Sequence, residues 1–307
     1  MPNDEQPSGA SLVADEPPRH DPAAAGWEPY HDEGFIGLVG PFWSRKSGER
    51  VEFAFMAQPK HHNRRDIVQG GMLMTFADRA TGMTCWYANE RQPQATAQLD
   101  MHFVEAVQIG DFVEAKCKVV RRTRALVFMS AELVVGTRVV ATANGVWKTL
   151  GKPNNEHQPG TRDAGKPAAR PPAFDPAAAG WTRSEDIGFV AMVGPIWARR
   201  AGDGEQYGFL AETKHHNRRG IVQGGMLMTF ADRAMGRTSF HANERQPQAT
   251  VQLDMHFVDA VQIGEFVEAR CKVVRRTRAL VFMSAELVVG TRVVAAANGV
   301  WKTLGKR

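Results

Sequence analysis

The chain has 307 residues, 43% of them hydrophobic and 23% charged, so it is long enough for two globular domains of ordinary size. No apolar run approaches the roughly 20 residues of a membrane-spanning helix, which argues against a membrane partner. The 3 cysteines are scattered, which excludes a disulfide framework and favours a reducing, cytoplasmic location.

The chain divides into a tail, two copies of one unit and a linker. Residues 1–20 are acidic and proline-rich without the build of a signal peptide, and they predict a disordered tail. The copies are residues 21–150 and residues 174–307, and they align from Asp21 and Asp175 onward at a constant offset of 154 residues, with no insertion. Residues 151–173 are rich in proline, glycine and charge and predict a linker. We therefore expect a fused version of a homodimer.

Each copy predicts two strands, one helix and four more strands. In the first copy the opening strands are 34–45 and 51–57, and the helix runs from 68 to about 87. Because helices and strands do not alternate, this order indicates an α+β fold with a curved antiparallel sheet around one helix. The four later strands are expected at about 94–106, 112–122, 125–136 and 138–149.

The most informative stretch is HHNRRDIVQGGMLMTFADRA at 61–80, which returns at 215–234 with a single difference. It combines a basic loop, a glycine pair and an apolar helix that carries Asp78. Gly71 and Asp78 share a helix face but lie roughly 10 Å apart along the axis, too far to act on one carbonyl. Two antiparallel helices would bring Gly71 close to Asp232, so we infer two composite sites, each built from both copies.

This stretch resembles the hotdog-fold acyl-CoA thioesterases, in particular the phenylacetyl-CoA thioesterase (PaaI-like) group. That family usually reads N-x5-HGG-x6-D, and both copies match except that glutamine replaces the histidine. The resemblance covers nearly all of both repeats and implies a tandem hotdog that hydrolyses acyl-CoA to a free acid and CoA without a cofactor. The matching residues are Asn63, Gln69, Gly70, Gly71 and Asp78, and Asn217, Gln223, Gly224, Gly225 and Asp232.

The resemblance also implies a role for each residue. Asp78 and Asp232 would act as nucleophile or general base, or else be ordinary polar helix residues paired with a neighbouring arginine. The glycine amides would polarise the thioester carbonyl. The glutamines would hydrogen-bond the thioester or the leaving group, with a plain loop hydrogen bond as the alternative. The asparagines would position the loop or the carbonyl, with helix capping as the alternative. Thr96 and Thr250 match a family Ser or Thr, but strand alternation puts Thr96 on the polar face unless a bulge or strand end turns it.

The net charge of +5 comes from arginines in short repeated clusters. Few aromatic residues lie between these arginines, so a phosphate-rich ligand such as coenzyme A suits the clusters better than nucleic acid. Solvent-exposed loop positions are the alternative for any single arginine. The clusters are Arg64, Arg65, Arg121, Arg122 and Arg124, and Arg218, Arg219, Arg275, Arg276 and Arg278.

Two other functions and the assembly of the protein stay open, whereas a metal site is not expected. The His61-His62 pair lacks partners at metal-ligand spacing, so no metal is expected. An enoyl-CoA hydratase would need an Asp and a His in one motif, and a non-catalytic acyl-CoA-binding module fits the glutamine that replaces the histidine. The long sheets would also allow two fused pairs to assemble further, back to back or edge to edge.

Overall fold

The computed structural model describes residues 21–151, 174–202 and 204–305. The expected tail and nearly all of the expected linker lie outside these residues. No helix in the described ranges is long and apolar enough to cross a membrane. The first repeat contains β1 Glu28–Tyr30, α1 Gly34–Val39, β2 Phe42–Ser47, β3 Arg50–Met56, the 3₁₀ turn η1 Pro59–His61, α2 Gly70–Ala88, β4 Gln94–Phe103, β5 Phe112–Arg122, β6 Leu126–Val135 and β7 Arg138–Thr149.

The second repeat follows the same order, as the constant offset predicts. Its elements are β8 Thr182–Arg183, α3 Gly188–Val193, β9 Ile196–Ala201, β10 Gly204–Leu210, the 3₁₀ turn η2 Thr213–His215, α4 Gly224–Ala242, β11 Gln248–Phe257, β12 Phe266–Arg276, β13 Leu280–Val289 and β14 Arg292–Thr303.

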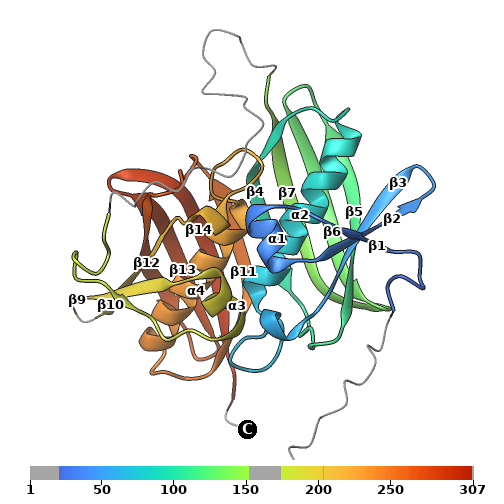
Figure 1. The fold of residues 1–307 in the computed structure, drawn as a ribbon. Coiled ribbons are helices and arrows are strands. Elements are labelled where there is room, and N and C mark those ends of the chain that lie inside the picture. The colour runs from blue at the N-terminus through green and yellow to red at the C-terminus, as the bar shows by residue number, and fades with distance from the viewer. Residues whose placement is uncertain (1–20, 152–173, 203, 306–307) are drawn as a thin grey trace, which may run out of the picture.

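All described strands join one antiparallel sheet in the order β1-β2-β3-β5-β6-β7-β4-β11-β14-β13-β12-β10-β9-β8. The repeats meet edge to edge where β4 pairs with β11, and Figure 1 shows the two halves side by side about this junction. Two matching hydrogen bonds of 2.6 Å cross it, from Gln98 to Asp254 and from Gln252 to Asp100. Each half of the sheet curves around one long helix, so the expected α+β architecture is confirmed.

Helices α2 and α4 are buried on nearly all sides because each packs on its own sheet and on the other helix. Gly71 faces Thr229 and Gly225 faces Thr75, so the two helices run antiparallel. The face of α2 that carries Gly71 and Asp78 therefore belongs to the contact between the repeats. A side chain at Gly71 would keep the helices apart, since an added Cβ would lie 2.8 Å from the Thr229 Cα.

The prediction of a strand over 34–45 is wrong in its first half, where the chain forms helix α1 and only then strand β2. Gly34 adopts a left-handed conformation (φ +60°), which turns the chain out of an extended path. Phe35, Ile36 and Val39 are buried on one face of the short helix. The Phe35 amide donates to the His216 carbonyl of the other repeat, and Phe189 does the same to His62. These apolar residues thus serve the clasp between the repeats rather than a strand.

The later strands match the predicted ranges closely, with one irregularity that matters for the site. The register of β4 against β7 shifts between Thr96 and Gln98, so Ala97 forms a bulge. The bulge places Thr96 opposite the buried Trp147, on the face of the sheet that holds the helix. The same shift occurs between Thr250 and Gln252.

We predict that Gly71→Ala and Gly225→Ala will each destabilise the protein by about 1–3 kcal/mol, because the new methyl group overpacks the crossing of α2 and α4. Urea unfolding monitored by circular dichroism measures the change. Gly204→Ala is the control, since a Cβ there meets its nearest neighbour only at 3.9 Å. Equal midpoints for all three variants would contradict a tight crossing.

Candidate active site

Each helix aspartate is held between its own sheet and the other repeat. Asp232 is only 7% exposed. Its Oδ1 accepts a hydrogen bond of 2.7 Å from the Thr250 hydroxyl on β11. Its Oδ2 accepts one of 2.8 Å from the side-chain amide of Gln69, at the start of α2 in the other repeat. Asp232 on α4 and Thr250 on β11, both in the second repeat, thus meet Gln69 of the first repeat.

The second aspartate has the same arrangement with the repeats exchanged. Asp78 is also 7% exposed and accepts from Thr96 at 2.7 Å and from Gln223 at 3.0 Å. Both predicted clusters of aspartate, glutamine and threonine are therefore brought together across the repeats. Thr96 and Thr250 reach the aspartates because of the strand bulges. The alternation of polar and apolar residues in the sequence required such a bulge, or a strand end, for this contact.

The two glycines of each pair have different structural roles. Gln69 caps helix α2, and its Oε1 accepts a hydrogen bond from the Gly71 amide. The Gly71 amide is therefore occupied and its Cα packs against Thr229, which differs from the expectation that both amides face a substrate. Gly70 is the first helical residue, so its amide has no acceptor within the helix. A Cβ at Gly70 would lie 3.5 Å from Asp232 Oδ2, which places this glycine beside the carboxylate.

Burial raises the pKa of both Asp78 and Asp232 above the ordinary aspartate value of 3.8. Loss of water around the carboxylate is the larger effect, and the hydrogen bonds from the threonine and the glutamine oppose it in part. A carboxylate with a raised pKa is a stronger base than an exposed one, which suits proton transfer.

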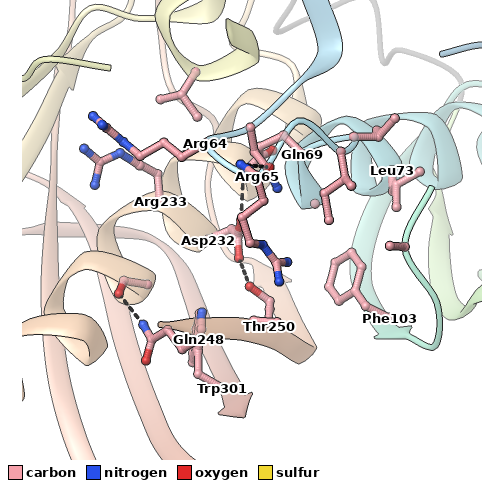
Figure 2. Close-up of a pocket in the computed structure, with 18 of the residues that line it drawn as sticks. Arg64, Arg65, Gln69, Leu73, Phe103, Asp232, Arg233, Gln248, Thr250 and Trp301 are labelled. Carbon is pink, nitrogen blue, oxygen red and sulfur yellow. Dashed lines mark hydrogen bonds between the residues drawn. The ribbon is translucent and has the colours of Figure 1, made fainter. Parts of the chain in front are cut away.

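A cavity of about 610 Å³ opens at Asp232 and falls in the size range of small-molecule sites. Figure 2 shows Asp232 between Gln69 above it and Thr250 below it, with Leu73 and Phe103 of the first repeat on the opposite wall. The lining of the cavity is chemically mixed, since it includes both apolar side chains and arginines. Its lining includes Asn63, Arg64, Arg65, Ile187, Val190, Arg233, Gly236, Arg237, Phe240, Gln248 and Trp301.

The predicted arginine clusters separate into two groups. Arg64 and Arg65 are exposed on the loop that precedes α2 and line the cavity. The clusters at 121–124 and 275–278 lie at strand ends outside the cavity lining. Within them Arg122 donates to the Ala88 carbonyl and Arg276 to the Ala242 carbonyl, so these two arginines hold the ends of the long helices. Asn63 and Asn217 shape the loops, each by accepting from the backbone amide two residues later.

A tyrosine makes the two sites unequal, and sequence reasoning missed it. The Tyr30 hydroxyl accepts hydrogen bonds from Arg79 at 2.6 Å and from Arg218 at 2.8 Å. Asp32 pairs with both arginines, at 2.5 and 3.1 Å, and so links α2 to the loop of the second repeat. The counterpart of Tyr30 is Ser184, and at the other site Arg64 donates to the Glu185 carbonyl instead. Comparison of the two copies position by position would have shown this difference.

The histidine pairs are structural. His61 is buried, and its Nε2 lies 2.8 Å from the Val39 carbonyl while its Nδ1 accepts from the Gln58 amide at 3.0 Å. Burial lowers the pKa of His61 and of His215 to about 4, so both rings are neutral near pH 7. In the described part of the chain, no group of three or more His, Cys, Asp or Glu side chains is arranged to hold a metal ion.

Comparison with known proteins identifies the family. The sequence model of the thioesterase superfamily matches residues 66–142 and again residues 219–296, one match in each repeat and together half of the chain. A Pseudomonas aeruginosa protein named "Putative esterase PA0474" is 32% identical over 125 residues, which cover 40% of this chain and 93% of that protein. The chain belongs to the thioesterase superfamily, and the expected thioester hydrolase with a duplicated unit is confirmed at that level.

Solved structures show the same fold. A hot dog fold protein of unknown function from Alicyclobacillus acidocaldarius superposes with a TM-score of 0.64 at 11% identity, covering 89% of this chain and 98% of that one. A tesB protein of Mycobacterium avium gives 0.60 at 11% identity, covering 88% and 98%. The acyl-CoA thioesterase II TesB2 of Mycobacterium marinum gives 0.55 at 11% identity, covering 89% and 98%. The expectation of a double hotdog is therefore confirmed.

We predict that the double variant Asp78→Asn/Asp232→Asn will be more stable than the parent at pH 7, by about 0.5–2 kcal/mol per site, because it removes two buried charges. The asparagine amide can donate to the threonine hydroxyl and its oxygen can accept from the glutamine, so each site keeps its hydrogen bonds.

The pH dependence follows from the raised pKa of the aspartates. The folded protein binds their protons more tightly than the unfolded chain, so the parent loses stability as pH rises from about 3.8 through the folded-state pKa. The stability difference between variant and parent should therefore grow over this range and vanish below it. Urea unfolding at several pH values checks this, and a difference that shrinks as pH rises would contradict it.

Proposed function

We propose that the protein hydrolyses acyl-CoA thioesters at composite sites between its repeats. The observation that carries this proposal is the position of Asp232, a buried carboxylate that contacts Thr250 of its own repeat and Gln69 of the other and that opens into the cavity. Membership of the thioesterase superfamily and the structural similarity to the acyl-CoA thioesterase II TesB2 and to a tesB protein support the substrate class.

In the proposed reaction the thioester carbonyl lies at the start of helix α2. The Gly70 amide points to the carbonyl oxygen and, with the dipole of the helix, stabilises negative charge on it. Asp232 takes a proton from a water molecule as the water oxygen attacks the carbonyl carbon. Thr250 holds the carboxylate so that its other edge faces this water. The C–S bond then breaks, and the sulfur leaves as the CoA thiolate, which takes up the proton.

The loop arginines fit the CoA half of the substrate. Arg64 and Arg65 are exposed where the cavity meets solvent, and guanidinium groups bind phosphate well. Asn63 fixes the turn that presents them, because its side chain accepts from the Arg65 amide at 2.8 Å. The adenosine phosphates would then stay outside and the acyl group would enter the cavity.

A second candidate is a non-catalytic acyl-CoA-binding protein, which one observation favours. The Gln69 side chain bonds both the Gly71 amide and Asp232 and so occupies groups that a reacting thioester could use. The structure does not favour the hydratase alternative, since Asp66 is exposed on the loop and its counterpart is Gly220.

We predict that the protein releases free thiol from some member of a panel of short, long and aromatic acyl-CoAs. The double variant Asp78→Asn/Asp232→Asn should lose at least about 100-fold in kcat, because it lacks the general base. A coloured thiol reagent follows the release. Circular dichroism confirms that the variant is folded, and the single variants give the share of each site.

Two outcomes would contradict the proposal. Acyl-CoA binding without thiol release by the parent protein would favour the binding protein. Full activity in the folded double variant would remove the aspartates from the mechanism.

We further predict that kcat/KM will fall on the acid side of a pH profile. Only the ionised aspartate accepts a proton, and the pKa of Asp232 is raised above 3.8, so activity should disappear at a higher pH than an ordinary aspartate would give. Initial rates from pH 4 to 8 measure the midpoint, with unfolding at each pH as the control. A flat profile down to pH 4 in a folded protein would contradict this role.

A further inference from the structure

The two repeats differ in a small cluster of residues beside the long helix, one of which, Arg237, lines the cavity. Four positions that lie together in repeat two are polar or charged, whereas three of their counterparts in repeat one are fully apolar. The pairs, at the constant offset of 154 residues, are Val51 and Glu205, Phe53 and Tyr207, Met83 and Arg237, and Tyr87 and His241.

In the second repeat these residues form one connected cluster. The Tyr207 hydroxyl, on a ring only 2% exposed, donates to Glu205 at 2.5 Å, and Glu205 lies 3.7 Å from His241. Burial and the Glu205 charge raise the pKa of Tyr207, while Arg237 lowers the pKa of both Tyr207 and Glu205. Arg237 therefore lies within electrostatic range of both and belongs to the cluster.

Arg237 also lines the cavity that opens at Asp232. Its guanidinium carbon lies 5.7 Å from the centre of the Phe240 ring, another lining residue. Its Nε is buried without a hydrogen-bond partner among the described residues. The preceding arginine on this side of α4, Arg233, also has a buried nitrogen without a partner, Nη1, but it forms an ion pair with Asp186 at 2.5 Å. Arg237 forms no ion pair within 4 Å among the described residues, so it brings an unneutralised guanidinium to the cavity wall.

At the Asp78 site the position that corresponds to Arg237 is apolar, and the nearby arginines, Arg79 and Arg218, are both paired with Tyr30 and Asp32. Met83 replaces Arg237 there, is buried, and packs with its sulfur 4.0 Å from the Tyr30 hydroxyl. Trp86 stands at the position of Phe240. The two sites share their aspartate, threonine and glutamine, so the difference concerns the part of the substrate that lies away from the thioester.

From this contrast we propose that the Asp232 site selects an acyl group whose far end is a carboxylate, which Arg237 binds. The proposal rests on the proposed hydrolysis of acyl-CoA. A guanidinium that lines a cavity without an ion-pair partner gains most from an anion that can accept two hydrogen bonds, and a carboxylate does so. Arg237 lies five residues beyond Asp232 on α4, about 7–8 Å along the axis, so a short dicarboxylic acyl chain can reach from one to the other.

A phosphate group of CoA is an anion that would bind Arg237 through the same chemistry as a carboxylate. The buried position of the Arg237 Nε favours the acyl end of the substrate over the phosphates. Arg64 and Arg65, the arginines suited to phosphates, are exposed on the loop, whereas the Arg237 Nε is removed from solvent. The experiment must still separate the two anions. Adipoyl-CoA and hexanoyl-CoA do this, because they share the CoA half and the chain length and differ only in the terminal carboxylate.

The test uses the Asp78→Asn protein, in which only the Asp232 site can turn over substrate. In this background we compare Arg237→Met, which installs the residue of the other repeat, with Arg237→Lys. We expect kcat/KM for adipoyl-CoA to fall about 10- to 100-fold in Arg237→Met and less in Arg237→Lys, with hexanoyl-CoA unchanged or faster. Circular dichroism and unfolding midpoints verify that both variants fold.

Two results would overturn the proposal. An equal loss for both substrates would assign Arg237 to the CoA phosphates, and no loss for either would leave the cluster a purely structural one. Calorimetric binding of the same two CoA esters to Asp78→Asn/Asp232→Asn, with and without Arg237→Met, decides the matter independently of turnover. If the parent protein hydrolyses no acyl-CoA, the proposed function fails, and the difference in binding still answers the question about Arg237.

Discussion

Helices α2 and α4 can cross closely only because glycine stands at the contact, with Gly71 against Thr229 and Gly225 against Thr75. This approach brings the first turn of each helix to the middle of the other. Gln69 then meets Asp232 and Gln223 meets Asp78, at distances of 2.8 and 3.0 Å. The joined sheet, the clasp at Phe35 and Phe189 and the buried aspartates all depend on this spacing, so the site is a property of the pair of repeats and of neither alone.

Much of this arrangement could be predicted from the sequence, because it follows from periodicity and from duplication. The long helix, the four later strands and the meeting of the glycine end with the opposite aspartate are all encoded in local patterns. Helix α1 could not be predicted in this way, since Phe35, Ile36 and Val39 suit a strand equally well and are fixed by a contact with the other repeat. The motif predicts a free Gly71 amide that faces the substrate, because a sequence does not show that the Gln69 side chain occupies this amide.

The bulge at Ala97 illustrates the same limit. Strict alternation puts Thr96 with the polar residues of β4, and a single extra residue moves it to the helix side, where it bonds Asp78 at 2.7 Å. No residue type in that segment marks the bulge. The unequal corners around Tyr30 and Arg237 were, in contrast, readable from the sequence. They become visible once the two copies are compared with each other, because a fused pair can change one site without changing its twin.

The ends of the continuous sheet bear on how this molecule can meet another copy of itself. The outermost strands are β1, with 3 residues, and β8, with 2 residues. Such short strands offer few unpaired backbone groups, and short edges are one way in which proteins prevent sheets from joining. The β4 and β11 strands, by contrast, offer 10 residues each and are already paired with one another. The fusion thus pairs its long edge strands with each other, and the edges that remain in the described sheet are short.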